Sequence, residues 1–201
     1  MFTALLDTSV LWPSLQRDFL LSLAIEQIYR PIWSSAILAE LEYHEARKLR
    51  DRHGIETEQS ERRAARLVST MRSAFVDAEI TGWEALEGTY GLPDPDDEHV
   101  VAAAHLGGAA VIVTSNLRDF PASRLPSGMG AMPPHQFALD ATQISPHRAL
   151  TAVAEIAARS GRSGPRSSTE VVIHRLEDKY GMTEAMTLVR EAARRRSSLG
   201  S

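Results

Sequence analysis

Short apolar runs alternate with helical periodicities along the first 120 residues of the chain. Runs near residues 2–6, 29–33, 75–80 and 109–114 are too short for helices and have polar or turn-forming neighbours, which predicts buried strands. Apolar residues recur every three to four positions in the intervening segments, which predicts helices over residues 10–27, 36–50 and 58–75 and one from Asp96 or Asp97 to Leu106, ended by Gly107 and Gly108. This order predicts an α/β fold with a parallel central sheet covered on both faces.

The pattern changes after Pro121. Residues 121–136 are rich in Pro, Gly and Ser and predict a loop or linker. Helical periodicity then returns in three segments, 146–159, 168–180 and 183–196. We therefore predict a first domain over residues 1–125, a linker with a short helix over 126–145, a helical C-terminal extension over 146–196 and a frayed tail over 197–201.

The composition excludes several kinds of chemistry. The 201 residues include no cysteine, so disulfides, thiolate catalysis and thiolate metal sites are excluded, and any metal must bind to oxygen or imidazole. No apolar run reaches the roughly 20 residues that span a bilayer, and the first residues lack the basic start of a signal peptide. We expect a cytoplasmic protein with no membrane partner. The net charge is −4, with a basic segment from Arg159 onward and an acidic remainder.

Acidic residues occupy positions that a parallel sheet would bring together. Asp7 ends the first strand, Asp119 follows the last strand, Glu40 lies in the first turns of its helix and Asp97 begins another helix. The carboxyl ends of parallel strands form the functional crevice of such folds. Close carboxylates repel one another unless protons or a cation intervene, and oxygen ligands favour Mg²⁺ or Mn²⁺, which commonly bridge to phosphate oxygens. The pattern thus points to phosphoryl chemistry, although Asp96 or Asp97 could be only a helix N-cap.

Other kinds of site find less support in the sequence. No HExxH spacing, Walker motif or hydrolytic triad is present, and we interpret His99 and His105 as surface or packing residues. A DNA-binding module built on the C-terminal helices is disfavoured, because residues 160–168 are too long for the tight turn of a helix-turn-helix.

Three segments carry a family resemblance. LLDTSVL, ILAEL and LPDPDDEHVVAAAHLGGAAVIVTSNLRDFP, within residues 2–121, resemble the PIN-domain nucleases and in particular the VapC-type toxins of bacterial toxin–antitoxin systems. The resemblance implies a three-layer α/β/α fold with a central parallel sheet and a helical C-terminal extension. It also implies a Mg²⁺-dependent (or Mn²⁺-dependent) endoribonuclease that hydrolyses RNA phosphodiester bonds, with a cognate antitoxin and a homodimeric assembly as partners.

The same resemblance assigns roles to residues. It places metal ligands on Asp7, Glu40 and Asp97. Asn116 stands where many relatives have a fourth aspartate, and Asp119 could supply that carboxylate instead. The expected site therefore comprises the catalytic residues Asp7, Glu40, Asp97 and Asp119, the substrate-orienting residues Thr114, Ser115 and Asn116, and possible contributions from Asp94 and Asp96.

Basic residues are expected to bind the RNA phosphates that flank the acidic centre. The candidates are Arg118, next to the last strand, and Arg62 and Arg63, within a basic stretch from Arg47 to Arg72. An arginine opposite an apolar stripe can equally be the solvated face of a helix. A further alternative is a noncatalytic adaptor that keeps the fold and binds protein or RNA, with Asn116 reflecting lost activity.

Overall fold

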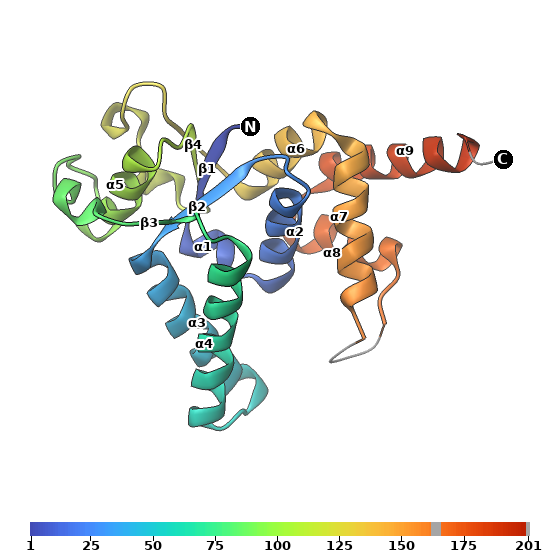
Figure 1. Ribbon diagram of the computed structural model, residues 1–201, viewed down its shortest axis with the longest axis horizontal. Helices are drawn as coiled ribbons and strands as arrows, with labels where there is room; N and C mark the ends of the chain where they lie inside the picture. The colour runs from blue at the N-terminus through green and yellow to red at the C-terminus, as the bar shows by residue number, and fades with distance from the viewer. Residues whose placement is uncertain (162–165, 200–201) are drawn as a thin grey trace. The chain divides into compact units, whose positions relative to one another are not determined.

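The computed structural model describes residues 1–161 and 166–199 (Figure 1). Within these residues the chain divides into two compact units. The sheet unit consists of Phe2–Trp12 and Pro31–Met132. The helical unit consists of Met1, Pro13–Arg30 and the described residues from Pro133 onward.

A five-stranded parallel sheet is the centre of the sheet unit. Its strands are β1 (Thr3–Leu6), β2 (Arg30–Ser34), β3 (Glu79–Ile80), β4 (Val111–Val113) and β5 (Gly130–Met132), in the order β3-β2-β1-β4-β5. Leu5 lies opposite Ile112 in the β1–β4 pair. The predicted α/β fold, with a parallel sheet flanked by helices, is confirmed.

The sequence prediction was wrong about β5, which falls in the segment expected to be a loop. Gly130, Ala131 and Met132 have neither β-branched side chains nor an alternating pattern, so their strand conformation depends on pairing with β4. The Gly130 N–H donates to the Ala110 carbonyl at 3.0 Å, and the Thr114 N–H donates to the Met132 carbonyl at 3.0 Å. Tertiary pairing, rather than local preference, makes this edge strand.

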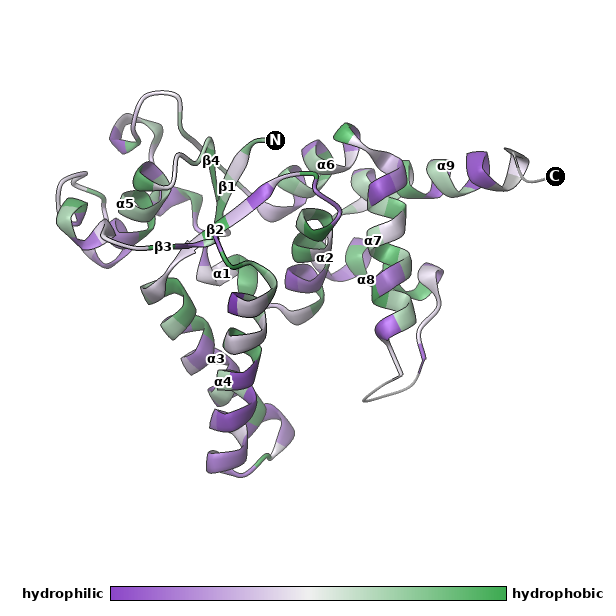
Figure 2. Ribbon diagram, in the orientation of Figure 1, coloured by the Kyte–Doolittle hydropathy of each residue, from purple (hydrophilic) through white to green (hydrophobic). Residues whose placement is uncertain are grey.

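Helices of the sheet unit begin and end at residues with capping chemistry. They are α1 (Thr8–Leu11), α3 (Ser35–His53), α4 (Thr57–Ala74) and α5 (Glu98–Leu106), with short 3₁₀ segments η1 (Trp83–Leu86), η2 (Pro95–Asp97), η3 (Leu117–Asp119) and η4 (Ala122–Arg124). The Ser34 hydroxyl accepts the Ile37 N–H at the start of α3, and Gly54, at φ 61°, ends it. Polar residues gather along α3 and α4 in Figure 2.

One predicted helix is two. Residues 10–27 were expected to form a single helix, but α1 ends at Leu11 and α2 (Ser14–Ile25) begins after Pro13. Proline has no N–H to continue a helical hydrogen-bond ladder, and Pro13 is extended, with ψ 111°.

The core of the sheet unit is formed by the strands and the helices that contact them. Leu5, Ile32, Trp33 and Ile112 are fully buried. Helix α5 packs on β1 and β4, whereas α3 packs on α1 and α4. Gly107 ends α5 where a Cβ atom would approach the Ile32 Cδ1 to 2.4 Å, so a larger residue there would force the Ile32 side chain to move.

The helical unit contains α2, α6 (Pro134–Ile144), α7 (Pro146–Arg159), α8 (Thr169–Tyr180) and α9 (Thr183–Leu199). Helix α2 packs on α7, so residues that our sequence-based ranges placed in the first domain join those of the C-terminal extension. Tyr29 and Phe137 meet edge to face, with ring centroids 4.8 Å apart. Helix α9 continues to Leu199, past its predicted end at Arg196, and residues 162–165, 200 and 201 lie outside the described residues.

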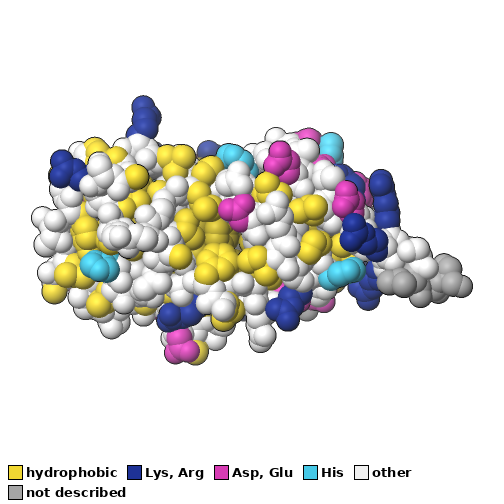
Figure 3. Space-filling view, turned by 90° about the horizontal axis from the view of Figure 1, so that it is seen from above, with side chains coloured by type: hydrophobic (Ala, Val, Ile, Leu, Met, Phe, Trp, Pro, Cys, Tyr) yellow, Lys and Arg dark blue, Asp and Glu magenta, His cyan; other side chains and the backbone are white. Residues whose placement is uncertain are grey.

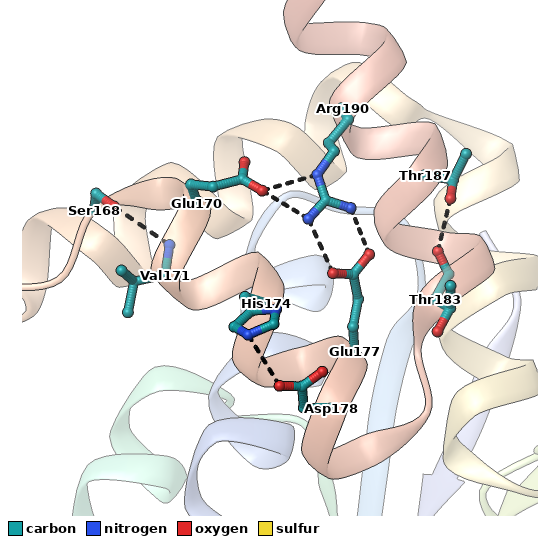
Figure 4. A network of polar contacts seen from close by, with 9 residues as sticks. All are labelled: Ser168, Glu170, Val171, His174, Glu177, Asp178, Thr183, Thr187 and Arg190. Carbon is teal, nitrogen blue, oxygen red and sulfur yellow. Dashed lines mark hydrogen bonds and ion pairs between the residues drawn. The ribbon is translucent and has the colours of Figure 1, made fainter.

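An arginine joins α9 to two carboxylates of α8 (Figure 4). The Arg190 guanidinium contacts the Glu170 carboxylate at 2.7 Å and the Glu177 carboxylate at 2.9 Å. The Glu177 side chain is only 15% exposed. Hydrogen bonding to Arg190 holds the pKa of Glu177 below its ordinary value.

Arg190→Met is expected to lower the free energy of unfolding by about 1–3 kcal/mol at pH 7, because Glu177 would remain largely buried without its partner. The folded-state pKa of Glu177 is depressed, so this stabilisation is present above its ordinary pKa of 4.5 and is lost as pH falls through the folded-state value. Urea unfolding at pH 7 and at pH 3 measures the difference. Arg194→Met, an exposed change on the same helix, is the control. An equal loss at both pH values would contradict the prediction.

The surface offers no simple guide to function. On the face seen in Figure 3, apolar side chains gather over the middle of the view, and charged side chains of both signs lie mostly around them. Across the part of the chain that the structure describes, no helix has both the length and the apolar character needed to cross a bilayer.

Candidate active site

A cavity of about 350 Å³ in the sheet unit brings distant acidic residues together. Its walls come from the segments that follow β1 and β4, from α3 and from η2. The lining residues are Asp7, Thr8, Ser9, Trp12, Glu40, His44, Asp97 and Asn116. The structure therefore places the three acids expected as metal ligands, Asp7, Glu40 and Asp97, in one cavity with Asn116.

Asp7 is held in place by the backbone of the neighbouring strand β4 and by two hydroxyls. Its N–H donates to the Val113 carbonyl at 3.1 Å, which extends the β1–β4 ladder by one residue. Its Oδ2 accepts hydrogen bonds from the Ser9 Oγ at 2.6 Å and the Thr114 Oγ1 at 2.7 Å. Asp7 is 6% exposed and Thr114 is fully buried. The Thr114 hydroxyl therefore orients the carboxylate of Asp7.

Glu40 is oriented by a buried histidine. Its Oε2 accepts the Thr8 hydroxyl at 2.5 Å, and its Oε1 lies 3.2 Å from the His99 Nε2. The other ring nitrogen of His99 lies 3.3 Å from the Ser34 Oγ. Burial alone would raise the pKa of Glu40, but the hydrogen bonds from His99 and Thr8 outweigh it and lower that pKa. Glu40 is thus kept ionised.

His99 is the site residue that the sequence did not reveal. We expected a surface or packing role, and the ring is indeed buried beside Trp83, but it also contacts Glu40, which was not expected. Its position two residues after Asp97 is a weak signal. Nothing in the spacing indicates a partner on α3.

Asp97 has an unusual electrostatic environment. Burial raises its pKa, and the negative charges of Asp7, Asp119 and Asp94 raise it further, to about 6. Asp97 precedes α5, but its side chain makes no capping hydrogen bond, which contradicts the alternative that it is only an N-cap. The capping side chain is that of Asp94, which accepts the Asp96 N–H at 3.0 Å in η2. The carboxylate of Asp97 is left for another partner.

The remaining acidic and polar candidates lie around this centre. Asp119, in η3, does not line the cavity but is close enough for its charge to act on Asp97. Asp94 and Asp96 are exposed and lie outside the lining. Asn116 lines the cavity, and the N–H of the exposed Ser115 donates to the Ser9 Oγ at 3.0 Å.

The basic candidates are not part of the cavity lining. Arg118, in η3, is exposed. Arg62 and Arg63 are exposed on α4, and Arg62 forms an ion pair with Glu58 one turn earlier. The Arg62–Glu58 pair is typical of a solvated helix face.

The donor set suits a hard cation. Over residues 1–161 and 166–199, no three Asp, Glu or His side chains already converge closely enough to hold a metal ion, and both oxygens of Glu40 have protein partners. Asp7 and Asp97, in contrast, form no ion pair with a described residue. Burial and then the negative charge of Asp7 raise the pKa of Asp97, and a divalent cation between carboxylate oxygens would relieve this repulsion.

Comparison with known proteins gives one match. A family model for the PIN domain matches residues 3–118, which include strands β1 to β4 and every residue lining the cavity. The match agrees with the five-stranded parallel sheet flanked by helices. No curated protein and no solved structure matches the chain.

Proposed function

Because the chain belongs to the PIN domain family, whose members are generally nucleases, we propose that it is a Mg²⁺- or Mn²⁺-dependent endoribonuclease. The observation that carries this proposal is that Asp7 and Asp97, which are far apart in sequence, meet in one cavity and form no salt bridge with a described residue. Asp7 is buried and Asp97 is half-buried, and two such carboxylates that repel each other destabilise the fold unless a cation binds between them.

The residues of the cavity have different roles in the proposed phosphodiester hydrolysis. Asp7 and Asp97 would hold the cation, which when bound lowers the pKa of water and neutralises charge on the phosphate. Ser9 and Thr114 fix the carboxylate of Asp7. Glu40, ionised and fixed by His99 and Thr8, can accept a hydrogen bond from the attacking water. Water then adds to phosphorus, and the bond to the leaving sugar oxygen breaks.

Asn116 is suited to contact the substrate. It lies on the cavity wall, and its N–H donates to the Thr114 Oγ1 at 3.0 Å, which fixes the backbone beside Asp7. An amide carries no charge, so it can donate a hydrogen bond to a phosphate oxygen without repelling it.

The biological role that we propose is that of the toxin in a VapC-type toxin–antitoxin system. The support is the resemblance of the three motifs around Asp7, Glu40 and Asp97 to those toxins. A cognate antitoxin and a homodimeric assembly belong to this proposal. Sequencing the 5′ ends of cellular RNA after induction would identify the RNA that is cut, and a chain whose induction creates no new ends would contradict the role.

Chelation is expected to abolish RNA cleavage. Without a cation the carboxylates repel the phosphate, and no group lowers the pKa of the attacking water. The measurement is cleavage of single-stranded RNA after treatment with EDTA and after excess Mg²⁺ or Mn²⁺ is restored. Asp7→Asn protein purified in the same way controls for contaminating ribonucleases. Undiminished cleavage in EDTA by the wild-type chain alone would refute the metal dependence.

A further inference from the structure

A second cavity adjoins the carboxylate cavity. Its volume is about 290 Å³, and it is lined by Trp12, His44, Arg47, Lys48, Asp51 and Arg52. Trp12 and His44 line both cavities, so these two side chains stand where one cavity meets the other. We call this second cavity the α3 groove, because all of its residues except Trp12 belong to α3.

Trp12 fixes the junction. Its Nε1–H donates to the His44 carbonyl at 3.3 Å, and the two rings meet edge to face with centroids 6.4 Å apart. The Arg52 guanidinium lies over the indole at 5.4 Å from a ring centroid, and the Lys48 ammonium lies at 5.9 Å. Such cation–π contacts hold a cation in position without neutralising it.

Arg52 differs from the other two cations of the α3 groove in having no acidic partner among the described residues. Arg47 pairs with Asp51 at 3.3 Å, and Lys48 pairs with Glu45. Among the described residues, Arg52 has no carboxylate partner. The groove therefore has one positive charge that is held on an aromatic face and is open to an anion.

We propose that the α3 groove binds a backbone phosphate of the RNA strand next to the phosphate being cut, with Arg52 as the phosphate ligand and Trp12 as its positioning residue. This inference rests on the proposed ribonuclease function. An acidic centre cannot attract the strand, so an adjoining cation must hold it, as in other grooves that follow a single-stranded backbone.

The geometry favours a phosphate over a stacked base in this groove. Trp12 is the obvious platform for a base, but Lys48 and Arg52 already lie over its ring. Arg66, an exposed arginine of α4, lines neither cavity and so lacks this relation to the cut site. Arg52 and Arg66 therefore carry the same charge, but only Arg52 lies next to the carboxylate cavity.

The experiment measures how RNA binding depends on salt, apart from cleavage. The full chain carrying Asp7→Asn binds a single-stranded RNA oligonucleotide in EDTA, followed by fluorescence anisotropy across a salt series. Log affinity falls with log salt, and loss of one phosphate contact makes this slope less steep by about 0.7 for a single strand. We expect that decrease, with several-fold weaker binding at low salt, for Arg52→Gln. Arg52→Lys should keep the slope, because it keeps the charge.

Three further variants test whether the effect is specific to Arg52 and Trp12. Trp12→Leu should lower the slope, because Arg52 loses its aromatic support, and Trp12→Phe should restore it. Arg66→Gln, which removes an exposed charge from α4, should leave the slope unchanged. Equal slopes for Arg52→Gln and Arg66→Gln would overturn the inference. If the wild-type chain cleaves RNA but Arg52→Gln leaves the slope unchanged, phosphate binding in the α3 groove is wrong and the proposed function stands. If the wild-type chain cleaves no RNA with either metal ion, the proposed function itself is wrong.

Discussion

Asp7→Asn is expected to slow RNA cleavage by at least about a thousandfold, equivalent to about 4 kcal/mol in the activation barrier. The change keeps the size of the side chain and leaves an oxygen for the Ser9 and Thr114 hydroxyls. It removes the negative charge that a cation needs, and so it should act on the reaction much more than on the fold. The measurement is the single-turnover rate with saturating Mg²⁺.

Asp97 supplies a readout of the same substitution that does not depend on activity. Burial and then the charge of Asp7 raise the pKa of Asp97 to about 6. In Asp7→Asn that pKa should fall, although not to its ordinary value, because the burial remains. NMR titration of the Asp97 carboxyl measures the change, and an unmoved pKa would mean that the two carboxylates do not interact.

A matched control separates catalysis from general charge effects. Glu84→Gln removes an exposed carboxylate from η1 of the same unit and should leave the rate unchanged. If Asp7→Asn and the wild type cleaved RNA equally well, or if neither cleaved it, the chain would be better described as an adaptor that keeps the fold without the chemistry.

Glu98→Gln is expected to lower the free energy of unfolding by about 2–4 kcal/mol. Glu98 is 2% exposed, and its two oxygens accept the N–H groups of Tyr90 at 3.0 Å and Leu92 at 2.8 Å. Burial alone would raise its pKa, but the backbone hydrogen bonds outweigh burial and lower it. A glutamine amide can accept through one atom only, so one buried N–H loses its partner.

The pH dependence of this loss follows from the sign of the shift. The folded-state pKa of Glu98 is depressed, so its stabilisation is complete above the ordinary value of 4.5 and disappears as pH falls through the folded-state pKa. Urea unfolding, followed by tryptophan fluorescence, should show a large difference from wild type at pH 7 and a small one at pH 3. Glu84→Gln again serves as the control, and equal stability of Glu98→Gln and wild type at pH 7 would refute the role.

The sequence predicted those elements whose local pattern is strong. Strand β4 is β-branched and unbroken, and α3 begins at a serine cap and ends at a left-handed glycine, so both could be located from residue types alone. Strand β5 could not, because its glycine, alanine and methionine are extended only through pairing with β4. The packing of α2 on α7 could not be predicted either, since an apolar helical face does not specify which other helix covers it.

The same distinction applies to the candidate site. Strand ends and helix starts identified the acids, because topology gathers those positions at one edge of a sheet. The contacts that orient the acids were harder to predict. Thr114 was expected to orient the substrate, not Asp7, and the contact of His99 with Glu40 was not expected, because neither contact has a periodic signature in the sequence.

The pairing of Asp7 with Thr114 has a consequence for synthesis of the protein. The two residues are 107 positions apart, and the backbone of Asp7 also bonds to Val113. A nascent chain therefore lacks this cavity until β4 has emerged from the ribosome and paired with β1. Under the proposed ribonuclease function, a chain that is still being synthesised therefore has no complete active site before that point.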